Sequence, residues 1–73
     1  MQDHEVIGRQ GVVLLRIPGG DVPGKVSVEV RGSRETFIAY AEEPIEETCE
    51  ILVFDSRGER KVDVMKAPWS QGD

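Results

Sequence analysis

The sequence has few of the residue types on which catalysis and cross-linking depend. Its 73 residues include one cysteine, Cys49, and one histidine, His4. A single cysteine excludes an intrachain disulfide and a cysteine-rich zinc site. A single histidine near the N-terminus leaves Ser27, Ser33 and Ser56 without a base for a hydrolase triad. We therefore expect no enzymatic activity, no catalytic residue, no metal ion and no cofactor.

Long apolar runs and an excess of positive charge are also missing. No run approaches the roughly 18 to 20 apolar residues of a membrane-spanning helix, and residues 1–4 lack the basic start and apolar stretch of a signal peptide. The net charge is −5. Because binding to phosphates or anionic bilayers requires cations that release counterions, we expect no nucleic-acid partner and no direct membrane insertion. A neutral or basic protein surface is the better partner.

The composition is that of one small folded domain. Hydrophobic residues make up 38% of the chain and charged residues 32%, which is typical of a soluble globular protein and too apolar for a disordered one. A core of this size stabilises a fold by only a few kcal/mol net. The domain therefore has little stability to spare.

A strict alternation predicts one central strand over residues 24–30. Val26, Val28 and Val30 alternate with polar neighbours, so a pleated strand places three β-branched side chains on one face. Gly24 and Gly32 allow the chain to turn at both ends. This pattern predicts a half-buried strand with its valines in the core.

The other apolar runs predict four further strands. These strands are expected at residues 12–17, 36–41, 49–54 and 61–65. The first is continuously apolar, which favours either a strand covered on both faces or one strongly bent within a barrel. In the strand expected at residues 36–41, Phe37, Ala39 and Ala41 share the inward face.

Polar segments connect these strands. A tight turn is expected at 32–34, and an acidic crossing segment at 42–47 with Ile45 as its anchor to the core. Residues 55–59 predict a short hairpin loop in which Gly58 adopts a positive φ. Cys49 has the inward phase of its strand, where a free cysteine behaves as a small hydrophobic residue.

Five short strands, no long helix and a closing hairpin predict an all-β, five-stranded Greek-key barrel of the OB type, with an SH3-like barrel as the alternative. We expect a flexible N-terminus at residues 1–5, the barrel at 6–66 and a flexible C-terminal tail at 67–73. The sequence leaves open whether Trp69 in this tail folds back onto the barrel.

Two motifs of apparent chemical interest have simpler interpretations. Residues 19–25 have the spacing of a phosphate-binding P-loop, but Val26 replaces the magnesium-binding hydroxyl and a strand follows instead of a helix. Five glutamates fall within residues 42–50 without the ligand spacing or turn glycine of a calcium loop. We interpret the first as an inter-strand loop and the second as a solvated acidic segment.

Several short segments resemble the C-terminal domain of NfeD-like proteins. They are residues 6–13, 23–28, 37–39, 51–53 and 62–64. In that family, glycines around the first strand and a proline-glycine step before the second shape the barrel, as Gly8, Gly11, Pro23 and Gly24 would here. The resemblance covers about residues 6–66.

The resemblance implies a soluble OB-fold domain of an integral membrane protein, on an undetermined side of the membrane, that works beside stomatin- or flotillin-like scaffold proteins. We predict a protein-interaction surface at Ile38, Tyr40, Leu52 and Phe54, which have the outward phase of their strands. The alternatives are an OB-type module for single-stranded nucleic acid or oligosaccharide, and a purely structural domain that positions its neighbours. The partner's identity and the oligomeric state stay open.

Overall fold

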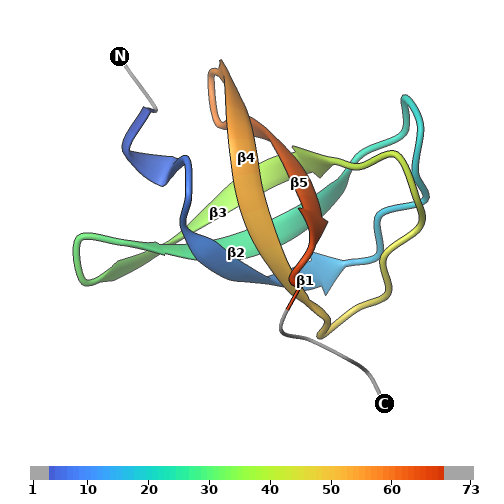
Figure 1. Cartoon of the computed structure of the whole chain (residues 1–73), viewed down its shortest axis with the longest axis horizontal. Coiled ribbons are helices and arrows are strands. Elements are labelled where there is room, and N and C mark those ends of the chain that lie inside the picture. Colours follow the sequence, from blue (N-terminus) through green and yellow to red (C-terminus); the bar gives the residue numbers. More distant parts are fainter. Residues whose placement is uncertain (1–3, 69–73) are drawn as a thin grey trace.

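Five strands close into a barrel in the computed structural model, which describes residues 4–68 (Figure 1). The elements are η1 His4–Val6, a 3-10 helix, followed by the strands β1 Gln10–Leu15, β2 Gly24–Val30, β3 Ser33–Tyr40, β4 Glu50–Gly58 and β5 Lys61–Lys66. The strand order around the barrel is β1-β2-β3-β5-β4. The predicted all-β, five-stranded barrel without a long helix is confirmed, and the SH3-like alternative does not apply.

The longest pairing joins β2 and β3 in an antiparallel hairpin that extends beyond the barrel (Figure 1). Its register runs from Gly24 opposite Ala39 to Val30 opposite Ser33. The turn is formed by Arg31 and Gly32, with φ angles of 55° and 80°, as a tight two-residue hairpin turn requires. The predicted turn at 32–34 was therefore wrong by about one residue, since Ser33 already belongs to β3.

Two short pairings close the barrel. β3 and β5 run parallel over three residue pairs, from Ile38 opposite Lys61 to Tyr40 opposite Asp63. β1 and β4 are antiparallel, also over three pairs. After Tyr40 the chain leaves the sheet, whereas β5 continues to Lys66. The last three residues of β5 therefore have no β3 partner beside them.

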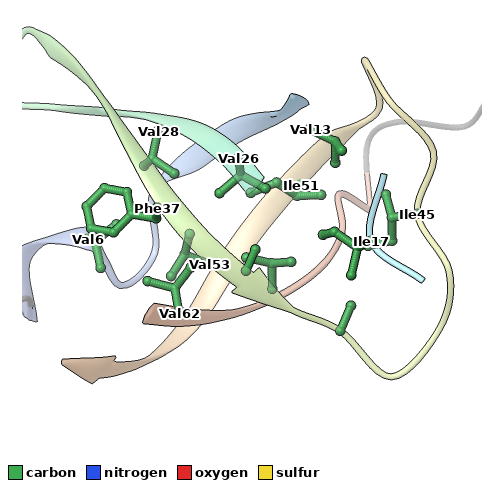
Figure 2. Packing of buried hydrophobic residues seen from close by; sticks show 13 residues of the cluster. Val6, Val13, Ile17, Val26, Val28, Phe37, Ile45, Ile51, Val53 and Val62 are labelled. Atoms are coloured by element: carbon green, nitrogen blue, oxygen red, sulfur yellow. The ribbon is translucent and has the colours of Figure 1, made fainter. Parts of the chain in front are cut away.

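The core fills the barrel with apolar side chains from every strand (Figure 2). Its buried residues are Val6, Val13, Ile17, Val26, Val28, Phe37, Ala39, Ala41, Ile45, Ile51, Val53, Val62 and Val64. Val26 and Val28 are fully buried as predicted, whereas Val30 is partly buried because it lies in the projecting end of the hairpin. Ile45 anchors the crossing segment by pairing with Ile17 through two backbone hydrogen bonds of 2.9 Å.

The continuous apolar run of the first strand belongs to a bent strand. Val13 and Ile17 are buried, but Leu14 and Leu15 between them are 46% and 51% exposed. The pairing with β2 shifts between Val13 and Leu15, and such a bulge bends the strand and breaks the strict alternation of side chains. The predicted bounds 12–17 were also displaced, because β1 covers Gln10–Leu15 and Ile17 forms only an isolated bridge.

Because of this bulge, we expect substitutions at Leu15 and at Val13 to change the free energy of unfolding by different amounts. We expect Leu15→Gln to change the free energy of unfolding by less than about 0.5 kcal/mol, because the side chain faces solvent. Val13→Ala should cost about 2 kcal/mol through two lost buried methyl groups and the cavity they leave. Urea denaturation of both variants measures the difference. Equal losses would show that both residues face the core.

The second hairpin is tighter than the sequence predicted. β4 continues through Gly58, with irregular pairing between Val53 and Asp55 and again between Ser56 and Gly58. The turn lies at Glu59 and Arg60, whose φ angles are 55° and 65°. The expected loop at 55–59 was therefore largely wrong, because bulges let a polar stretch stay paired. The positive φ predicted for Gly58 is confirmed at 80°.

The ends of the described chain are held to the barrel. Glu5 pairs with Arg31 at 2.5 Å, and Val6 is buried. At the other end, the buried Ala67 donates its backbone N–H to the carbonyl of Glu50 at 3.0 Å. The predicted boundaries at 1–5, 6–66 and 67–73 stay predictions, and Trp69 lies outside the described residues.

Candidate interaction surface

The four residues predicted to form an interaction surface come from strands on either side of β5. Ile38 and Tyr40 lie on β3 and are half-buried. Leu52 and Phe54 lie on β4, where Leu52 is half-buried and Phe54 is 53% exposed. β5 runs between the two pairs. Their role as an interaction surface stays a prediction.

A charged group on β4 and β5 separates the two pairs. The Arg57 guanidinium donates Nη2–H to Asp63 Oδ1 at 2.8 Å and Nε–H to both Asp63 oxygens at 3.2 Å. It also lies over the Tyr40 ring, 3.9 Å from the centroid. The hydrogen bond to Asp63 raises the pKa of Arg57 above its usual value, against an opposing effect of desolvation. Arg57 therefore stays charged and covers one face of the tyrosine.

A second arginine lies over the other aromatic residue of β3. The Arg60 guanidinium is 5.2 Å from the centroid of the Phe37 ring and pairs with Glu35 at 2.6 Å. Phe37 itself is buried. Each of the two arginines therefore combines a cation–π contact to a β3 ring with an ion pair to a carboxylate.

On the other side of Asp63, a pocket of about 390 Å³ opens between β5 and the crossing segment. It is lined by Ala41, Glu42, Glu43, Pro44, Ile45, Phe54, Val64, Met65 and Lys66. The two large hydrophobic side chains exposed in it are Phe54 and Met65, the latter 42% exposed. The pocket exists because β3 leaves the sheet after Tyr40 while β5 continues.

Met65 is the member of this surface that sequence reasoning missed. It stands opposite Leu52 in the β4–β5 pairing and has the same outward phase. The signal was available, because Met65 alternates with the buried Val62 and Val64 in the fifth strand. The sequence could not show that β5 and the crossing segment lie next to each other.

Charge is unevenly placed around the pocket. Glu42 and Glu43 are exposed and form no ion pair within residues 4–68. Farther along the crossing segment, Glu46 pairs with Arg16 at 2.9 Å. Lys66 lies at the end of β5 on the opposite side. The crossing segment therefore gives the pocket one acidic wall.

The motifs that the sequence set aside lie in ordinary structural positions. Residues 19–23 lie in the connection between β1 and β2, and Gly24 and Lys25 begin β2. Cys49 is half-buried and packs against the core. Among the described residues, no three His, Cys, Asp or Glu side chains come close enough to hold a metal ion.

No helix within residues 4–68 is long and apolar enough to cross a bilayer.

The barrel, its strand order and its filled core define an OB-type domain, and comparison with known proteins identifies its family. The family model for the NfeD C-terminal domain matches residues 10–65, from the start of β1 almost to the end of β5. The chain belongs to this family, which confirms the predicted resemblance.

A solved structure agrees. The chain is similar to the solution structure of the soluble domain of the NfeD protein YuaF from Bacillus subtilis, with a TM-score of 0.71 and 25% sequence identity. The match covers 84% of this chain and 73% of that chain. No curated protein matches the chain.

Proposed function

We propose that this domain is a non-catalytic protein-interaction module of a membrane-anchored NfeD-type protein, and that it binds stomatin- or flotillin-like scaffold proteins. The observation that carries the proposal is the placement of Phe54 and Met65, two large apolar side chains exposed beside a surface pocket. Membership of the NfeD C-terminal domain family supports the wider setting.

The physical basis is the cost of leaving these side chains in water. The few residues that dominate the binding energy of a protein interface lie in well-packed pockets from which water is excluded. Phe54 is 53% exposed and lies where the β4–β5 register shifts between Val53 and Asp55. Covering it with a partner removes apolar surface from water without rearranging the barrel.

The proposal is tested by mapping a partner onto the barrel. Addition of a stomatin-like protein to the 73-residue chain should shift the backbone amide resonances of Phe54 and Met65 and of β3 around Ile38 and Tyr40. Phe54→Ser should weaken binding by about tenfold or more, as expected for the loss of a central interface residue.

The matched control is Val22→Ser, which removes an equally exposed apolar side chain from the β1–β2 loop. Both variants should unfold at nearly the wild-type urea midpoint, because both side chains are more than half exposed. Absence of shifts on β3, β4 and β5, or equal weakening by the two variants, would contradict the proposal.

The alternative role in binding single-stranded nucleic acid finds less support. Such binding uses aromatic rings on which bases stack within a basic groove. Residues 4–68 contain three Phe or Tyr rings and no Trp, and of these Phe37 is buried and Tyr40 is covered on one face by Arg57. Phe54 remains, and it lies beside the acidic Glu42 and Glu43. A protein partner is the better fit to this surface.

A further inference from the structure

The pocket at the crossing segment has apolar lining residues and borders the part of β5 that lies beyond its pairing with β3. Pairing between β3 and β5 ends at Tyr40 and Asp63. The chain then runs outward through residues 41–44 and returns at Ile45, which is held on Ile17 (Figure 2). Residues 64–66 of β5 pair with β4 on one side, but no strand pairs with them on the side of this detour, where an extended segment could lie.

The dimensions suit side chains rather than a large ligand. The pocket holds about 390 Å³, near the lower end of the roughly 300 to 1,000 Å³ of small-molecule sites. Its apolar walls come from Ile45, Phe54 and Met65. One large apolar side chain, inserted from outside, would contact all three walls.

The charges around the pocket favour some partner segments over others. Glu42 and Glu43 are unpaired within residues 4–68 and lie on the same side of the pocket. Glu47 follows on the same exposed segment, and the chain as a whole carries a net charge of −5. A lysine or arginine beside the inserted side chain would meet these carboxylates, whereas an acidic residue there would be repelled.

We infer that this pocket binds an extended partner segment that inserts one large apolar side chain between Phe54 and Met65 and presents an adjacent lysine or arginine to Glu42 and Glu43. The inference rests on the proposed role as a protein-interaction module and specifies the chemistry of the segment that is bound. Glu42 and Glu43 make binding specific for a basic segment, and the apolar walls supply most of the contact area.

Two synthetic peptides test the inference on the 73-residue chain. Both are nine residues long with a central Leu-Phe pair, and they differ only in flanking lysines or flanking glutamates. The lysine peptide should shift amide resonances of residues 41–45 and 64–66 and bind about tenfold more tightly than the glutamate peptide. This advantage should shrink at high salt, because exposed charges are screened.

Variants separate the apolar and the charged contributions. Met65→Ser should weaken the lysine peptide by about tenfold, whereas Val22→Ser, an exposed valine in another loop, should leave it unchanged. The double variant Glu42→Gln and Glu43→Gln keeps the shape of the wall and removes its charge. It should bring the two peptides within about twofold of each other.

Several results would overturn the inference: no binding, equal affinity for both peptides in the wild-type chain, or shifts confined to Ile38 and Tyr40. If a stomatin-like protein binds and Phe54→Ser weakens that binding while neither peptide binds, the proposed function stands and this inference fails.

Discussion

Replacing Val28 with aspartate is expected to abolish folding of the domain. Val28 is fully buried in the middle of β2, among side chains that are all apolar. No buried polar or charged side chain occurs within residues 4–68, so the new carboxylate would find no partner. An unpaired buried charge costs several kcal/mol, about as much as the whole net stability of a domain this small. Circular dichroism and the dispersion of amide resonances measure the outcome.

The same substitution at an exposed valine is the control. Val22 lies in the β1–β2 loop and is 54% exposed, so Val22→Asp should keep the fold and unfold within about 0.5 kcal/mol of the wild type. A cooperative unfolding transition of Val28→Asp near the wild-type midpoint would mean that β2 does not face the core as described.

The second large effect is expected at Gly24, the first residue of β2. A Cβ atom at this position would lie 2.4 Å from the carbonyl oxygen of Leu15 and 2.5 Å from that of Arg16. Both contacts are with backbone, so no side chain can rotate away to relieve them. Because β1 would have to move off β2 at its bulge, we expect Gly24→Ala to cost about 3 kcal/mol of unfolding free energy, measured by urea denaturation.

Gly20 provides the comparison for Gly24. Gly20 lies in the loop that precedes β2, and a Cβ there would meet nothing within 4 Å, but its φ is +63°. Gly20→Ala should therefore cost only about 1 kcal/mol, from the left-handed backbone conformation alone. If the two alanine variants were equally stable, close approach of β1 and β2 at Gly24 would not be the reason for the glycine.

Much of the barrel could be predicted from local pattern. The alternation of Val26 and Val28 with polar neighbours placed β2 correctly, and the inward face of Phe37 and Ala39 was also right. The errors fall at bulges and turns. Leu14 and Leu15 are both exposed because the register of β1 shifts there. A bulge of this kind cannot be predicted from the alternation of apolar and polar residues.

The candidate surface was predictable only one strand at a time. Ile38, Tyr40, Leu52 and Phe54 have the outward phase of their strands, which can be read from alternation. The alternation does not say that β5 runs between β3 and β4. For this reason the sequence grouped four residues that Asp63 and Arg57 divide in space.

The pocket depends on pairing between strands that are distant in the sequence. It arises because the parallel pairing of β3 and β5 stops at Tyr40 while Met65 continues the strand beyond it. Phe54 and Met65 are 11 positions apart in the chain and meet the crossing segment only in the closed barrel. Their joint role could not be inferred before the strand order was known.

By itself, the sequence determined that this chain forms a small all-β domain with a valine-rich core, because side-chain periodicity and turn residues act over a few neighbouring positions. It also determined the family to which the domain belongs. Only the tertiary structure decided which outward side chains share a surface and where the pocket opens, because both follow from the order in which distant strands pair around the barrel.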